Sequence, residues 1–220
     1  AEVIDMKTLP RKAGLAKDVL EYAQERRYDA IVVGRRGLSG IQEIFMGSLT
    51  TNLVKYSKVI PVWIIDGDAP SGKIMIAIDG SESTRRAVDH FCFMAGNNPD
   101  TKVTLFHVAA GLSDYCKIDI PDEDEELEEI ILKGDKKCIE NFLIHAYKQF
   151  EEAGIGKDQI EIKEVRAIAN VGKAITEEAE KGDYSTVVVG RRGISNAFFM
   201  GSVSNYVLDK TSNRALWLVP

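Results

Sequence analysis

Short, uninterrupted apolar segments alternate along the chain with longer segments in which apolar side chains recur every three or four positions. The short segments are rich in Val and Ile, as at 31–33, 186–189 and 215–219. Such segments indicate strands buried on both faces, and their alternation with amphipathic helices is typical of a parallel sheet covered on both sides. The pattern therefore predicts an α/β fold.

The pattern is most complete from residue 73 onward, where five strands are separated by helices. The expected strands are 73–79, 102–108, 160–165, 186–189 and 215–219, and the expected helices are 83–95, a long helix from the acidic run 122–129 to about 152, 171–181, and one near 202–210. We expect a parallel five-stranded doubly wound sheet with the flavodoxin-like order 3-2-1-4-5.

The first 66 residues repeat only the last part of that order. Strands are expected at 2–6, 31–33 and 62–65, and helices at 15–26 and near 48–57. Trp63 and Trp217 fall at matching positions of the two closing strands. A polar segment with Gly and Pro, 67–72, reads as a linker. We therefore expect residues 1–66 to be the C-terminal half of a repeated domain and 73–220 to be the complete domain.

The shorter copy leaves its strand 31–33 without the neighbouring strands of the complete domain. In the expected sheet order, the third strand of a domain does not touch the fourth, because the first and second lie between them. Those two strands have no counterpart in 1–66, so Ile31 to Val33 would carry an unpaired apolar edge, which proteins usually cover. We expect a longer natural chain or another subunit to supply the missing half.

Composition narrows the function by exclusion. The net charge of −6 argues against a general nucleic-acid binder. No apolar run is long enough for a membrane span, and the N-terminal AEVIDMKTLPRKAG lacks the apolar core of a signal peptide. Cys92, Cys116 and Cys138 are too far apart for a metal knuckle or a redox pair, so we expect reduced thiols in a cytoplasmic protein.

One phrase occurs twice, as VVGRRGLSGIQEIFMGS at 32–48 and VVGRRGISNAFFMGS at 188–202. In the first copy Gly34 and Gly37 follow a buried strand, and Gly47 and Ser48 begin a helix. Glycines allow close backbone approach, and a helix N-terminus offers unpaired N–H groups and a favourable dipole. The phrase therefore indicates a phosphate cradle, although simple turn geometry in an α/β loop is the alternative.

Three side chains in and near this phrase have two readings each. Ser48 caps its helix or binds a phosphate oxygen. Arg35 and Arg36 place positive charge beside the cradle or are solvated.

These motifs together resemble the universal stress protein family. The resemblance rests on G-x2-G-x9-G-[S/T] after a V-V-G strand, on AIDGS at 77–81 and on LFHV at 105–108. It covers essentially the whole chain as a tandem arrangement. It implies a stress-response regulatory protein that binds an adenine nucleotide, ATP or AMP, with Mg²⁺ accompanying ATP.

The resemblance also assigns roles to residues. Asp79 would contact the adenine or its ribose end, and Val108 would line the adenine pocket. The residues implied to hold ribose and phosphates are Gly190, Gly193, Gly201 and Ser202, and the first copy supplies Gly34, Gly37, Gly47 and Ser48. Asp79 could instead serve only as a helix cap.

The family's closing strand commonly pairs across a dimer interface. We therefore expect strands 62–65 and 215–219 to pair in a pseudo-two-fold arrangement and to mediate self-association. The alternative is that each is an ordinary edge strand.

One departure from the family pattern concerns loop length. Nine residues separate Gly37 from Gly47, but seven separate Gly193 from Gly201. Since an extended residue spans roughly 3.3 Å, the shorter loop can move the second cradle by several ångströms.

The remaining titratable residues offer no catalytic constellation. His107 lies in an apolar strand and reads as a satisfied core histidine, whereas His90 and His145 read as helix-surface residues. No Ser-His-Asp set, P-loop lysine or metal cluster can be assembled, which favours binding over turnover. Two alternatives remain: a dimerisation or scaffold module of the same fold that binds no nucleotide, and an AMP-forming enzyme of a related α/β class, for which no catalytic Lys or Cys set is present.

Overall fold

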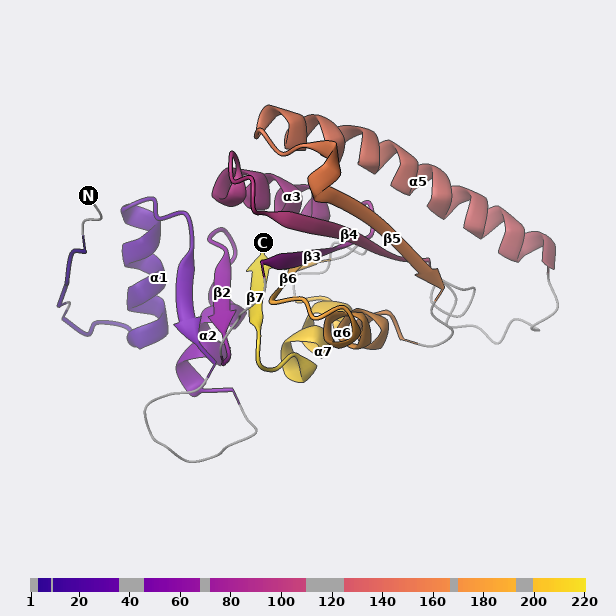
Figure 1. Ribbon diagram of the computed structural model, residues 1–220. Coiled ribbons are helices and arrows are strands. Elements are labelled where there is room, and N and C mark those ends of the chain that lie inside the picture. Colours follow the sequence, from indigo (N-terminus) through magenta and orange to yellow (C-terminus); the bar gives the residue numbers. More distant parts are fainter. Residues whose placement is uncertain are drawn as a thin grey trace.

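A computed structural model describes residues 4–8, 10–35, 46–67, 72–109, 125–166, 170–192 and 200–220 (Figure 1), with the backbone alone at 125–132. Its centre is a seven-stranded sheet of order β1-β2-β7-β6-β3-β4-β5. The strands are β1 (Ile31–Gly34), β2 (Val62–Ile65), β3 (Lys73–Ile78), β4 (Lys102–Ala109), β5 (Ile160–Arg166), β6 (Thr186–Gly190) and β7 (Ala215–Val219).

The five strands from residue 73 onward confirm the predicted topology. They are parallel and lie in the order β5-β4-β3-β6-β7, which is 3-2-1-4-5 when they are counted along the chain. Alternate side chains of these strands face opposite sides of the sheet. Met75 and Val187 belong to one apolar core, and Ile76 and Val188 belong to the other.

Helices cover both faces of this half of the sheet (Figure 1). The helices are α1 (Leu15–Glu25), α2 (Ser48–Tyr56), α3 (Glu82–Ala95), α5 (Glu125–Glu152), α6 (Val171–Lys181) and α7 (Ser202–Lys210), with a short 3-10 turn η1 (Lys157–Gln159). The helices α3 and α5 pack on one face through Phe91 and Phe150, whereas α6 and α7 pack on the other through Ile175 and Val207. The helix that follows β3 and the helix that follows β6 therefore lie on opposite faces of the sheet.

The closing strands of the two copies pair with each other, as the family resemblance implied for a chain that holds both copies. The strands β2 and β7 are antiparallel, with Trp63 opposite Trp217, so the whole sheet is mixed and not purely parallel. The two indole rings stack at a centroid distance of 3.9 Å and an angle of 1°. This pairing lies within one chain, and β1 and β6 occupy the outer edges of β2 and β7.

The first copy contributes β1, β2, α1 and α2 and a small core of its own. Leu20, Ile31 and Leu53 are buried together between α1, β1 and α2. The strand predicted at 2–6 is absent from the residues described there, because 4–6 form no strand, and 2–3 lie outside the described part. Without neighbouring strands, an alternating pattern has no ladder to join.

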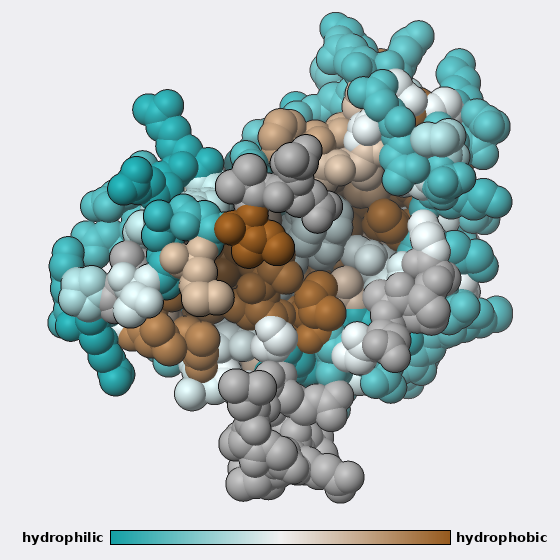
Figure 2. All heavy atoms as spheres, turned by 60° about the vertical axis from the view of Figure 1, so that its left-hand side comes forward, coloured by the Kyte–Doolittle hydropathy of each residue, from teal (hydrophilic) through white to brown (hydrophobic). Residues whose placement is uncertain are grey.

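The outer edge of β1 is one of the two open edges of the described sheet, and β5 forms the other. Among the described residues, β1 pairs with β2 only, and Val32 is 59% exposed. Figure 2 shows apolar atoms at the surface on this side of the molecule, between hydrophilic areas. None of the helices described here combines the length and apolar character of a membrane span.

Candidate functional site

The candidate site of the longer copy lies at the carboxyl edge of β3, β4 and β6. The strands β3 and β6 are adjacent and parallel, and the helices that follow them, α3 and α7, go to opposite faces of the sheet. In open α/β sheets, ligands bind outside the carboxyl ends of strands at such a switch point. Asp79 and Gly190 stand at the ends of these two strands.

Asp79 is tied to the start of α3 by its side chain. Its Oδ1 accepts hydrogen bonds from the Ser81 backbone N–H at 3.0 Å and from the Thr84 hydroxyl at 3.1 Å. Ser81 in turn is the N-cap of α3 and accepts from the Thr84 N–H. The carboxylate therefore supports the cap, as one sequence reading suggested. Both of these bonds use Oδ1, which leaves Oδ2 as the oxygen with capacity for a further donor.

Gly190 is fixed by close packing against the first turn of α3. A Cβ at this position would lie 2.6 Å from Ser83 Oγ and 3.1 Å from the Ser83 carbonyl carbon. The same hydroxyl accepts a hydrogen bond from the Arg192 N–H. Only glycine allows β6 to end this close to α3, so the end of β6 packs on the same first turn of α3 that Asp79 supports.

The N-terminus of α7 is the natural anion-binding element of this edge. Its N-cap is Gly201, which offers no side chain to bond the first N–H groups, and Ser202 is exposed in the first turn. The helix α2 begins in the same way, with Gly47 as N-cap and Ser48 exposed. Ser48 is thus not the cap of its helix. Uncapped first turns carry the unpaired donors and the dipole that bind anions.

Equivalent hydrogen bonds close both glycine-rich loops, despite their different lengths. Gly47 N–H donates to the Arg35 carbonyl at 3.0 Å, and Gly201 N–H donates to the Arg191 carbonyl at 3.0 Å. A hydroxyl in the first turn of each helix closes a second bond, to the carbonyl of Gly34 from α2 and of Gly190 from α7. The shorter second loop therefore does not displace the start of α7.

The structure describes some of the other predicted site residues. Val108 is 7% exposed and lies one residue before the end of β4, next to the last position paired with β3, so it lies at the same edge as Asp79. Gly37 and Gly193 lie outside the described residues. The strand ends that lead into the two glycine-rich loops lie at opposite edges of the sheet, because β1 is parallel to β2, β6 is parallel to β7, and β2 and β7 are antiparallel.

Next to Ser48, a cavity of about 370 Å³ lies beside the start of α1 and the start of α2 and is lined by Arg11, Lys17 and Asn52, among others. Two cationic side chains thus border the first copy's helix start.

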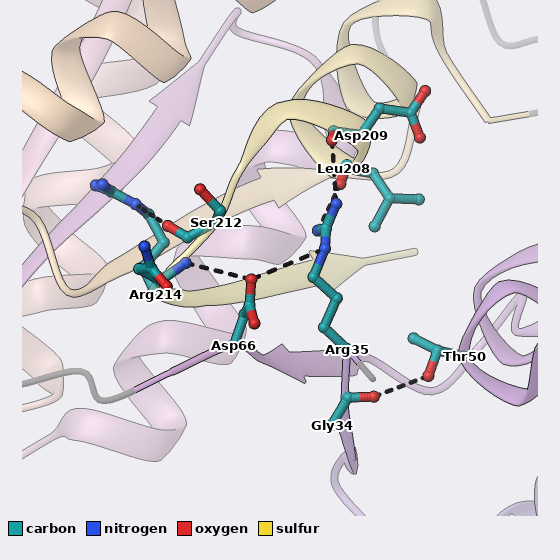
Figure 3. A network of polar contacts seen from close by, with 9 residues as sticks. Gly34, Arg35, Thr50, Asp66, Leu208, Asp209, Ser212 and Arg214 are labelled. Atoms are coloured by element: carbon teal, nitrogen blue, oxygen red, sulfur yellow. Dashed lines mark hydrogen bonds and ion pairs between the residues drawn. The ribbon is translucent and has the colours of Figure 1, made fainter. Parts of the chain in front are cut away.

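Arg35 neither points to its own loop nor lies in solvent, contrary to both sequence readings. It is 8% exposed, and its guanidinium donates to the Leu208 carbonyl at 2.8 Å and the Asp209 carbonyl at 3.0 Å, both in the last turn of α7 (Figure 3). Its Nε lies 3.9 Å from an Asp66 carboxylate oxygen.

Arg191, the equivalent residue of the second copy, makes the reciprocal contact. It is 5% exposed and donates to the carbonyls of Lys55 and Ser57 at the end of α2. Burial, and to a lesser degree Arg192, lowers the pKa of Arg191. Sequence reasoning missed both contacts. The only signal for them is that the same arginine recurs in both copies.

Two histidines complete the polar framework. His107 is the satisfied core residue predicted, since Nδ1 donates to the Ile78 carbonyl and Nε2 lies 3.0 Å from Asp135 of α5. His90 is not a helix-surface residue, contrary to prediction. Its Nε2 accepts from the Trp63 indole N–H at 3.0 Å, and its ring lies edge-on to both stacked indoles. His145 is exposed, as predicted.

Comparison with known proteins decides the family. The model of the universal stress protein family matches residues 11–66 and 70–216. The chain belongs to the universal stress protein family. A universal stress protein of Mycolicibacterium smegmatis is 22% identical over 99% of this chain and 70% of its own length.

Solved structures of universal stress proteins share the fold. A putative family member from Pseudomonas aeruginosa UCBPP-PA14 superimposes with a TM-score of 0.59 at 18% identity, over 94% of this chain and 69% of its own. One from Archaeoglobus fulgidus DSM 4304 gives a TM-score of 0.57 at 19% identity, over 93% and 64% of the two chains.

Proposed function

We propose that this protein binds an adenine nucleotide, ATP or AMP, in the segment 73–220, and that it acts as a cytoplasmic stress-response regulator with little or no turnover. The observation that carries the proposal is the convergence at the β3/β6 switch point. Asp79 and Gly190 both contact the first turn of α3, and the Gly190 carbonyl also accepts a hydrogen bond from Ser204 in the uncapped first turn of α7. The carboxylate suits the hydroxyls of a ribose, and the helix start suits phosphates.

A mutation of Ser202 gives the sharpest test. Ser202→Glu places a negative charge at the first turn of α7, where it would repel a phosphate, and the side chain is exposed, so the fold tolerates it. Ser212→Glu is the charge-matched control, because Ser212 is exposed beyond the other end of α7. We expect ATP to raise the unfolding temperature of the parent and the control, but not that of Ser202→Glu.

Gly190→Ala is a poor test of binding, because its Cβ would collide with Ser83 and disturb the fold itself. Asp79→Asn keeps the acceptor Oδ1 and removes the charge, and we expect it to weaken ATP binding. A parent protein without any thermal response to millimolar ATP or AMP would refute the proposal.

The alternative function is a scaffold or dimerisation module that binds no nucleotide. Arg35 and Arg191, the first arginine of each Gly-Arg-Arg-Gly phrase, favour this alternative. Their guanidinium groups bind carbonyls at the end of a helix of the other copy, so they join the two copies and are not directed at a phosphate of their own loop. Under this alternative, neither nucleotide changes the unfolding temperature, whereas Trp63→Ala still loosens the contact between the copies.

A further inference from the structure

The two candidate phosphate helices are linked by a closed series of contacts. Arg35 accepts at its carbonyl the hydrogen bond from Gly47, which is the N-cap of α2, and its side chain holds the end of α7. Arg191 accepts at its carbonyl the bond from Gly201, the N-cap of α7, and its side chain holds the end of α2. Each helix is thus fixed at its start by one arginine and at its end by the other.

The arginine backbones are themselves anchored to the closing strands. The Arg35 N–H donates to the Ile65 carbonyl at 2.9 Å, and the Arg191 N–H donates to the Val219 carbonyl at 2.6 Å. Because β2 and β7 are hydrogen-bonded to each other, neither arginine can shift without moving the strand pair. Buried charge-assisted hydrogen bonds to the last carbonyls of a helix are among the stronger polar contacts in proteins.

The two arginines are not held equally. Arg35 has Asp66 near its Nε, whereas the matching position of the second copy is Pro220, whose side chain carries no carboxylate. Both residues lie three positions after the tryptophan of their closing strand. Among the described residues, Arg191 Nε has no hydrogen-bond partner. The link from the second loop to α2 is therefore the weaker half of the series.

We propose that Arg35 and Arg191 are positioning residues, each of which sets the placement of the phosphate helix in the other copy and so couples the two candidate sites. This inference rests on the proposed function for its ligand. An anion bound at the start of α7 would move Gly201, hence Arg191, and hence the end of α2. The same path runs in the other direction from Gly47 through Arg35 to α7.

Arg35→Gln tests the coupling, because residue 35 belongs to the first copy and the proposed nucleotide site to the second. We expect faster amide hydrogen exchange in the last turn of α7 and an ATP affinity about fivefold or more weaker, the usual scale of coupling between sites. Arg35→Lys keeps the charge but loses the two-pronged donor, so it should recover part of the affinity. Arg27→Gln, an exposed arginine of the same copy, should behave as the parent.

The outcomes separate the two proposals. If the parent binds no ATP, the proposed function fails, and hydrogen exchange alone decides whether Arg35 holds α7 and Arg191 holds α2. Unchanged exchange in α7 of Arg35→Gln overturns the inference, and so does parental ATP affinity in that variant when the parent binds.

A double variant adds a thermodynamic test. In a closed series, the effects of Arg35→Gln and Arg191→Gln on stability are coupled and do not simply add, whereas independent contacts give additive effects. Additivity within the error of denaturant titration would overturn the inference.

Discussion

At the scale of single residues, His90 makes the contact between the copies sensitive to pH. The indole N–H of Trp63 donates to Nε2, so that nitrogen carries no proton in the folded protein. Burial lowers the pKa of His90 from its ordinary 6.5, and the nearby carboxylates of Asp29 and Asp89 oppose this only in part. Protonation would turn Nε2 into a donor and remove the bond.

We therefore expect stability to fall on acidification. Because the pKa is lower in the folded state, the unfolded chain binds the proton first, so the stability is fully present above pH 6.5 and is lost as pH falls through that value toward the lowered pKa. Thermal unfolding at about pH 7.5 and about pH 5.5 measures the loss. His90→Gln should show a smaller loss than the parent, whereas His145→Gln, an exposed control, should show the parental loss.

The cysteines offer a second residue-scale prediction. Burial, and then the charge of Asp89, raises the pKa of the Cys92 thiol to about 12, whereas Cys138 is exposed on α5. Since the thiolate is the reacting species, iodoacetamide should modify Cys138 in the native protein and leave Cys92 intact. Peptide mass spectrometry after native and denatured labelling reports each site. Rapid native labelling of Cys92 would contradict the packing around α3.

At the scale of elements, the packing of α6 on α7 depends on Gly172. A Cβ there would lie 2.9 Å from the Cβ of Tyr206, an atom that no rotamer change can move, so the helices would have to separate. Overpacking of this kind costs roughly 1–3 kcal/mol, against a gain of about 0.5–1 kcal/mol from replacing a helical glycine. Gly172→Ala should therefore lower the free energy of unfolding by about 1 kcal/mol.

Gly134 supplies the matched control for this substitution. It is exposed in α5, and a Cβ there would have no neighbour within 4 Å. Gly134→Ala should therefore raise stability by about 0.5–1 kcal/mol, because only the helix preference changes. Denaturant unfolding of both variants checks the opposite signs, and a stabilising Gly172→Ala would show that α7 is free to move.

The elements also show what a sequence can and cannot predict. Local period and turn residues were sufficient for the strands and helices from residue 73 onward, because each buries its own apolar face. They were insufficient at 2–6, where an alternating pattern has no described strand to pair with. His107 could be placed in the core by its apolar neighbours, but its partner Asp135 lies on another helix and carries no local signal.

At the scale of the whole molecule, the unpredicted contacts between the two copies depend on one register. The antiparallel pairing of β2 with β7 brings Arg35 to α7 and Arg191 to α2, between residues more than 130 positions apart. It also brings Trp63 under His90. The family resemblance, applied to two copies in one chain, predicted that the closing strands pair, but the side chains that flank the pairing become neighbours only once its register is set.

This pairing predicts that the two copies stay together without a covalent link. A protease recognition site inserted between Gly67 and Gly72 would allow the chain to be cut after folding. We expect the cut halves to elute together on size exclusion at about 10 µM, because the β2–β7 ladder, the tryptophan stack and both arginines hold them.

The contribution of the tryptophan stack can then be measured in the cut protein. The rings of Trp63 and Trp217 lie face to face at the centre of the ladder, so Trp63→Ala removes both the stack and the bond to His90. Aromatic pairs and large buried side chains contribute several kcal/mol in total, enough to turn a stable association into a dissociating one. We expect the cut Trp63→Ala halves to separate on dilution, whereas halves carrying Phe93→Ala, an exposed aromatic of α3, remain together. Separation of the parental halves would mean that the linker, and not the shared sheet, holds the molecule in one piece.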